Sequence, residues 1–402
     1  MAGKKEFGKG VVLEARIQRL LMCQGALAER ALFLRTSQSA PKLVTDVDIL
    51  AHDYNLNFQE HRIYAECKGG KNVSTLDRIV WIRGVIQAID ADTGILVLDH
   101  CDAESVEFAR GQGIQILMAS GLEALENALG IGMDFWPGRS NLAAYSEIEK
   151  EVERLIKDRD SGGFCDWLRV ATEMRREVAS VQLSYGRLNS LLRVLLGVKR
   201  VTESGALSPG RLPQARYAVA ALLVRLSQYA LFATADTLGM SKTEREAYLN
   251  TRLTAGSLSV DQFRSMLGSA LRLATSRLQE QGVEAPATWT VDHLSTPPEY
   301  AKPFAQVIER IVGDGHRARI LPLTMEIRLF GFAGNPKRSA GLLPRVGYGM
   351  ALTGLLKGFA VQSLGVPENL TNGPCGDVER VNSLVDQENG SQGTGEEGNL
   401  FG

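Results

Sequence analysis

The stretch that decides the fold is RIYAECKGGK, which runs from Arg62 to Lys71. An apolar run ends there in a glutamate and a lysine two positions apart, and the two glycines that follow predict a turn. Residues two apart in an extended strand project to the same side. We therefore expect Glu66 and Lys68 to share one face of a strand, with Cys67 on the other face.

The segment before it, KLVTDVDILAHDY at residues 42–54, alternates apolar and polar residues as a strand does. This alternation predicts that Asp46 and Asp48 lie on one face. The polar stretch NLNFQEH at residues 55–61 can turn the chain, so the two strands are expected to pair. Pairing would bring the aspartates close to Glu66 and Lys68, at one end of a sheet.

Such a cluster of carboxylates would cost several kcal/mol if it were desolvated without a partner ion. A bound cation resolves that cost, and oxygen ligands without histidine or thiolate favour Mg²⁺ or Mn²⁺. A metal ion polarises a phosphoryl oxygen and lowers the pKa of a bound water, and Lys68 would orient that water or stabilise developing charge. The pattern therefore points to hydrolysis of phosphodiester bonds.

Around this pair of strands the sequence predicts an α/β unit over residues 1–135. Residues 10–30 have helical periodicity, although Gly25 suggests a helix end within them. Ser74 can cap a helix over residues 75–89, and residues 94–130 alternate strand, helix, strand and helix. We expect a mixed sheet flanked by helices.

The remaining chain divides into three parts by pattern. Residues 142–282 have sustained helical periodicity and predict an all-α domain, joined to the first by a linker near residues 136–141. Residues 283–375 form a mixed, basic region with a possible strand at 320–334 and a possible helix at 349–365. Residues 376–402 are acidic and poor in apolar side chains, which predicts a disordered tail.

The composition is that of a soluble globular protein, and 402 residues with 44% hydrophobic side chains favour two or three domains. The net charge is only −1, but residues 301–360 carry nine basic and three acidic side chains, whereas residues 361–402 carry one and seven. Two solvated surfaces, or a basic segment regulated by an acidic tail, would both give this pattern.

The apolar residues 218–235 are interrupted by Arg225 and Gln228, which favours a core helix over a membrane span. The N-terminus has no long apolar region after its lysines, so no secretory signal is expected. Five scattered cysteines without a CxxC pair argue against a structural zinc site and against a disulfide framework. We expect a cytoplasmic protein without a membrane partner.

TDVDIL followed by YAECKGG resembles the signature of the PD-(D/E)xK nuclease superfamily, in which an aspartate precedes Glu-x-Lys on the next strand. The order of elements around it is similar to Mrr-type restriction endonucleases and archaeal Holliday-junction resolvases. The resemblance covers roughly the first third of the chain. It implies a restriction-endonuclease-like α/β core, Mg²⁺ or Mn²⁺ as cofactor, and DNA as partner.

By position in that signature, Asp48 and Glu66 match the metal ligands, and Lys68 matches the catalytic lysine. Glu14 matches a helix-borne acid that assists the metal through water. Asp46 lies on the same predicted face and shares or replaces the role of Asp48.

The resemblance also suggests nucleic-acid contacts. Arg35, Ser37 and Ser39 lie where resolvase-like members place groups that contact the scissile strand, and Lys71 is a candidate phosphate contact or a solvated turn lysine. One departure is Val47, which stands where the family often has proline.

Two functions follow as expectations. The first is an Mg²⁺-dependent endodeoxyribonuclease in bacterial restriction or antiviral defence, acting as a homo-oligomer or with partner subunits of a defence complex. The chain contains no GxxxxGK[ST] motif, so any ATP-driven translocation would need such a subunit. The alternative is a non-catalytic scaffold or regulatory subunit that keeps the nuclease fold.

Overall fold

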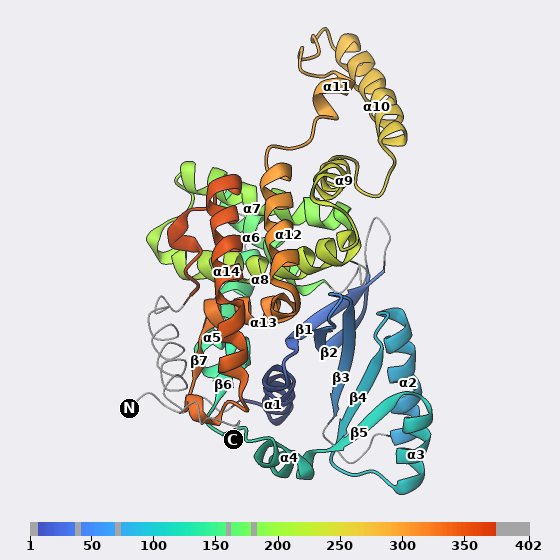
Figure 1. The fold of residues 1–402 in the computed structure, drawn as a ribbon, viewed down its shortest axis with the longest axis vertical. Helices are drawn as coiled ribbons and strands as arrows, with labels where there is room; N and C mark the ends of the chain where they lie inside the picture. Colours follow the sequence, from blue (N-terminus) through green and yellow to red (C-terminus); the bar gives the residue numbers. More distant parts are fainter. Residues whose placement is uncertain (1–6, 37–41, 69–73, 158–161, 178–182, 375–402) are drawn as a thin grey trace, which may run out of the picture.

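The computed structural model describes residues 7–36, 42–68, 74–157, 162–177 and 183–374 (Figure 1). They form a five-stranded mixed sheet flanked by helices, followed by a helical region. This agrees with the mixed α/β unit and the helical domain expected from the sequence. The predicted disordered tail, residues 376–402, lies outside the described residues.

The sheet has the strand order β1-β2-β3-β4-β5, so chain neighbours are also spatial neighbours. Strands β1 to β3 pair antiparallel, and β3, β4 and β5 pair parallel, with α2 and α3 as the crossovers. The strands are β1 (Leu27–Arg35), β2 (Leu43–Tyr54), β3 (Glu60–Lys68), β4 (Thr93–Leu98) and β5 (Ile114–Met118).

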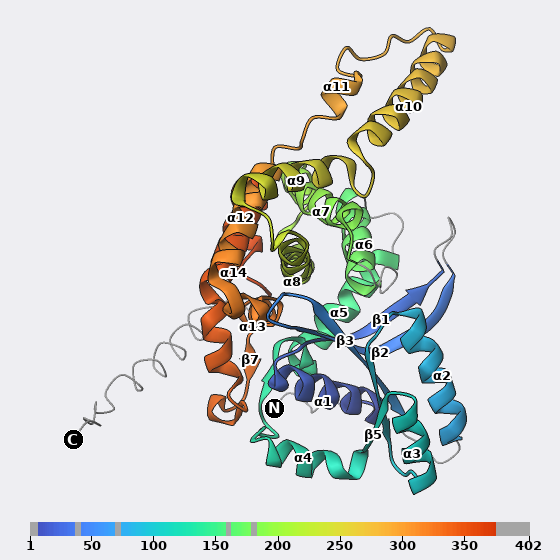
Figure 2. The ribbon, with the colours of Figure 1, turned by 45° about the vertical axis from the view of Figure 1, so that its right-hand side comes forward.

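Helices cover both faces of this sheet (Figure 2). On one face, Ile17 and Leu20 of α1 belong to the same buried cluster as Ala65 of β3. On the other, apolar residues of α2 and α3 pack on the sheet. A short helix, α4, follows β5. The helices are α1 (Lys9–Gln24), α2 (Thr75–Ala88), α3 (Ala103–Gly111) and α4 (Leu122–Ala128).

The first helix is shorter than the periodicity of residues 10–30 predicts. It ends at Gln24, because Gly25 takes a left-handed conformation with φ of 112° and caps it. Residues from Leu27 onward then enter β1. The suspected helix end at Gly25 is confirmed, and helix beyond it is wrong.

One buried core joins the helices of the predicted all-α domain to those of the basic region. The central helix α8 contacts α6 and α7 as well as α12 and α13, so residues on both sides of position 282 pack together. The helices are α5 (Leu142–Lys157), α6 (Gly163–Arg176), α7 (Tyr185–Glu203), α8 (Leu212–Thr237), α9 (Lys242–Ala255), α12 (Ala301–Asp314), α13 (Leu321–Phe330) and α14 (Leu342–Leu364).

The possible strand at residues 320–334 is wrong. Leu321–Phe330 is helix α13, with Pro322 in its first turn, where a missing backbone N–H costs nothing. Only Phe332–Ala333 (β7) is extended, and it pairs with Trp136–Pro137 (β6). Apolar residues on all sides of α13 are buried, so its periodicity was weak. The possible helix at 349–365 is confirmed by α14.

Helices α10 (Val260–Glu280) and α11 (Val291–Leu294) project away from the rest of the molecule (Figures 1 and 2). No residue of α10 is buried, and Met266 and Leu273 on it are exposed. This pair forms an arm at one end of the helical region.

Candidate functional site

The end of β3 positions the glutamate and the lysine as the alternation predicts. Tyr64 and Glu66 point toward the α2 side of the sheet, and Cys67 lies in the cluster on the α1 side. Glu66 is only 3% exposed, and Lys68 Nζ lies 3.3 Å from Glu66 Oε1. Lys68 is 37% exposed, so its ammonium pairs with the buried glutamate and also contacts solvent.

Two further side chains hold Glu66. Arg78, in the first turns of α2, contacts Oε1, and the hydroxyl of Tyr64 donates to Oε2. The helix that carries Arg78 is capped by Ser74, whose side chain accepts a hydrogen bond from the Asp77 N–H. Both oxygens of Glu66 are therefore engaged within the protein.

Asp48 lies where β2 separates from β3. The ladder between these strands ends at the pair Ile49–Ala65, so Asp48 and Glu66 come next on either strand. Asp48 Oδ2 accepts a hydrogen bond of 2.9 Å from the backbone N–H of Cys67. The structure thus brings Asp48 to the same edge as Glu66 and Lys68, as expected.

Glu14 reaches this edge from α1. Burial, and after it the charge of Asp48, raises the pKa of Glu14 to about 7, although Arg30 and Lys68 oppose the rise. Burial and the charge of Glu66 likewise raise the pKa of Asp48, against the Cys67 hydrogen bond. We call Glu14, Asp48 and Glu66 the carboxylate cluster.

The carboxylate cluster fits Mg²⁺ or Mn²⁺ in donor chemistry, since all three groups offer hard oxygen ligands. Burial and neighbouring carboxylates raise the pKa values of Glu14 and Asp48 more than the nearby cations lower them. Within the described residues, however, no three Asp, Glu, His or Cys side chains are arranged as a metal-binding group. To bind the ion, Glu66 would have to give up its contact with Arg78.

The other predicted site residues are placed differently. Asp46 is exposed, opposite Phe33 of β1, and lies outside the carboxylate cluster, so its expected metal role is not supported by its position. Arg35 ends β1, with its guanidinium carbon 5.8 Å from the centre of the Phe33 ring. Ser37, Ser39 and Lys71 lie outside the described residues.

Sequence reasoning missed Tyr64 and Arg78. Tyr64 was accessible to it, because Tyr64, Glu66 and Lys68 share one face of a strand by the same alternation. Arg78 was not, because its approach to Glu66 depends on how α2 crosses back over the sheet.

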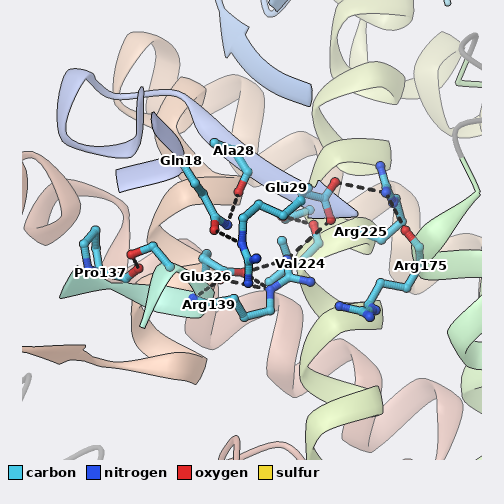
Figure 3. A network of polar contacts seen from close by, with 12 residues as sticks. Gln18, Ala28, Glu29, Pro137, Arg139, Arg175, Val224, Arg225 and Glu326 are labelled. Carbon is cyan, nitrogen blue, oxygen red and sulfur yellow. Dashed lines mark hydrogen bonds and ion pairs between the residues drawn. The ribbon is translucent and has the colours of Figure 1, made fainter. Parts of the chain in front are cut away.

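A second group of charges joins β1 to the helical region (Figure 3). Glu29 of β1 is 4% exposed, and Arg225 Nη2 of α8 lies 3.0 Å from its Oε2. Arg139 Nη2 lies 3.4 Å from Glu29 Oε1 and 2.9 Å from Glu326 Oε2 of α13. We call Glu29, Arg139, Arg225 and Glu326 the junction network.

A glycine allows the closest approach in the junction network. Arg139 lies in the short 3-10 helix η2 (Gly138–Ser140), and its backbone N–H donates to Glu326 Oε1 at 2.8 Å. Gly138 has φ of 53°, and a Cβ there would lie 2.7 Å from Glu326 Cγ. Only glycine leaves room for the carboxylate.

Comparisons with protein-family models, curated protein sequences and solved structures found no match to this chain. One described helical segment, Pro209–Thr237, is long and apolar enough to cross a membrane, but 83% of its apolar window is buried inside the protein. Such burial is typical of a core helix.

Proposed function

We propose that this chain is a metal-dependent endonuclease that hydrolyses DNA phosphodiester bonds. One observation carries the proposal: Asp48, Glu66 and Lys68 lie where the neighbouring strands β2 and β3 separate, and Glu14 reaches them from α1, with raised pKa values for Glu14 and Asp48. Perturbed carboxylates next to an accessible cation are typical of catalytic sites.

The order of elements supports a restriction-endonuclease-like fold for the α/β unit. Helix α1, the antiparallel strands β1 to β3, α2 and the parallel strand β4 follow one another as the resemblance implies. The aspartate lies on the strand before the Glu-x-Lys, and Glu14 lies on the first helix.

Each side chain has a role in this proposal. Asp48 and Glu66 would hold the divalent ion, which supplies Lewis acidity toward the phosphoryl oxygen and a more acidic water. Lys68, partly exposed beside Glu66, donates to a phosphoryl oxygen as negative charge develops there. Glu14, with a pKa of about 7, accepts or returns a proton of a water near neutral pH.

The biological setting follows from the same resemblance. We propose a cytoplasmic enzyme in bacterial restriction or antiviral defence, with DNA as substrate. Two copies of the chain, or partner subunits of a defence complex, would place two active sites on a duplex.

A second function is favoured by the contacts of Glu66. Because Arg78 and Tyr64 occupy both of its oxygens, a chain that never loads metal would keep this arrangement unchanged. Such a chain would serve as a nuclease-fold scaffold or regulatory subunit.

The deciding experiment is cleavage of supercoiled plasmid, plain and modified, with Mg²⁺ or Mn²⁺. Wild type should yield nicked or linear DNA, whereas Glu66→Ala and Lys68→Ala should lose activity by on the order of 10³-fold, as removal of one stabilising group often does. Asp46→Asn is the matched control on the neighbouring strand and should keep activity. Equal cutting by all four proteins, or none by any, would favour the scaffold, and an RNA substrate in parallel tests the nucleic-acid class.

A further inference from the structure

A polar cavity of about 50 Å³ lies between β1 and the helices α5 and α6. A water needs roughly 10–15 Å³, so the cavity has room for more than one water or for a compact oxyanion. Arginines line it from three elements: Arg30 from β1, Arg139 from η2, and Arg175 and Arg176 from α6.

The lining of this cavity has a positive excess. Its four guanidinium groups face two carboxylates, Glu29 and Glu149, which leaves a formal charge of +2. Both carboxylates are ionised, because the arginines lower the pKa of each despite its burial. Behind the lining, Arg225 and Glu326 cancel one another, and Glu153, which pairs with Arg176, lowers the excess to +1.

Several arginine N–H groups at the cavity have no protein acceptor among the described residues. Arg175 uses Nη1 for the Tyr217 hydroxyl at 3.0 Å and for Glu149 at 3.6 Å. Arg176 uses Nη2 for Glu153, while its Nε is buried without a partner. Figure 3 shows the guanidinium groups of Arg139 and Arg175 pointing toward one another with no interaction between them.

The cavity adjoins the carboxylate cluster. Gln18 lines it and lies one helical turn after Glu14 on α1. Arg30 donates through Nε to Gln18 Oε1 at 2.8 Å, and its charge also acts on Glu14. A ligand in the cavity would therefore lie next to a residue that is one helical turn from Glu14.

We propose that this cavity binds a phosphate dianion, either inorganic phosphate or the terminal phosphate monoester of a nucleic-acid strand. The positive excess of the lining attracts an anion, and guanidinium groups present paired N–H donors to tetrahedral oxyanions. The small volume admits one phosphate group and excludes a nucleoside. This binding does not depend on nuclease activity, so the two proposals can fail separately.

The test is calorimetric titration of the full chain with inorganic phosphate at constant ionic strength, with EDTA present and chloride as reference. We expect one phosphate per chain and at least about tenfold weaker binding for Arg175→Gln, because each arginine supplies charge-assisted hydrogen bonds. Arg176→Gln, at a partly exposed position, should also weaken binding and serves if Arg175→Gln fails to fold.

Two controls locate the site. Arg169→Gln removes a more exposed arginine of the same helix, paired with Asp166, and should leave phosphate binding unchanged. Glu66→Gln should also leave it unchanged, since the carboxylate cluster is a separate site. Two results would overturn the proposal. One is that wild type binds phosphate no more tightly than chloride; the other is that Arg175→Gln and Arg176→Gln both bind phosphate as tightly as wild type does.

A competition arm identifies the source of the phosphate. A 5′-phosphorylated oligonucleotide that displaces inorganic phosphate, when the 5′-hydroxyl form does not, would assign the cavity to a strand end. Displacement by neither oligonucleotide, with phosphate itself bound, would assign it to the free anion.

Discussion

The carboxylate cluster and the junction network both combine buried carboxylates with nearby cations, yet the pKa values of their carboxylates shift in opposite directions. Glu29 in the network keeps a lowered pKa because Arg225 and Arg139 outweigh the cost of its burial. Glu14 and Asp48 in the cluster have raised pKa values, because burial and neighbouring carboxylates outweigh the cations. Arginines of the protein thus stabilise the ionised form of Glu29, whereas the ionised forms of Glu14 and Asp48 are disfavoured in the folded chain.

The largest expected difference between the two groups is in stability. Glu326→Gln would leave Arg139 buried beside a neutral partner, and we expect a loss of about 3–5 kcal/mol in the free energy of unfolding. Asp48→Asn should cost little or stabilise the protein, since the folded state already disfavours the ionised form. Urea denaturation of both variants at pH 8 measures the two free energies of unfolding. Equal losses of stability would contradict the difference between the junction network and the carboxylate cluster.

Metal affinity gives the next largest effect. Arg78 occupies Glu66, so Arg78→Gln should bind Mn²⁺ more tightly, by about tenfold, as removal of a competing charge-assisted contact permits. Arg83→Gln on the same helix is exposed and is the matched control. Titration of Mn²⁺ followed by electron paramagnetic resonance reads the affinity directly. Unchanged binding would show that Arg78 does not compete with the ion.

Glu14 predicts a pH dependence of stability in metal-free buffer. Its folded pKa of about 7 lies above the ordinary value of 4.5, so the folded state binds more protons between these values and stability falls as pH rises through them. Glu14→Gln removes this loss and should raise the melting temperature by about 2–4 °C at pH 8, with no gain at pH 4. The same gain at both pH values would contradict the raised pKa.

The smallest effect is expected for Arg35, which ends β1 and contacts no charged partner in the described residues. Arg35→Ala should weaken DNA binding only several-fold. It should also lower the slope of the logarithm of the binding constant against the logarithm of salt concentration by about one. Fluorescence anisotropy over a series of salt concentrations tests both. Lys150→Ala, an exposed lysine of α5, is the comparison and should change neither value.

The sequence was informative wherever the contacts depend on local spacing. Alternation along β3 placed Glu66 and Lys68 together, and the paired strands brought Asp48 to them. Gly25 marked the helix end by its need for positive φ. The strand at 320–334 failed because α13 is apolar on all sides, which hides the helical period.

Contacts between distant segments could not be predicted in this way. Arg139 and Glu326 are 187 positions apart, and nothing in either local pattern links them. Arg78 reaches Glu66 only through the path of α2 over the sheet. Asp46 shows the converse, since its spacing placed it with Asp48 although the chain leaves it exposed.

The junction network bears on whether the α/β unit can be separated from the helical region. Glu29 lies within residues 1–135, but its partners Arg139 and Arg225 and the carboxylate of Glu326 all follow that segment. Cutting the chain at 135 would remove the arginine partners of Glu29 and would uncover the apolar surface of α1 that packs with α13 and α14. An exchange of the helical region would have to supply arginines at the positions of Arg139 and Arg225 to keep Glu29 paired.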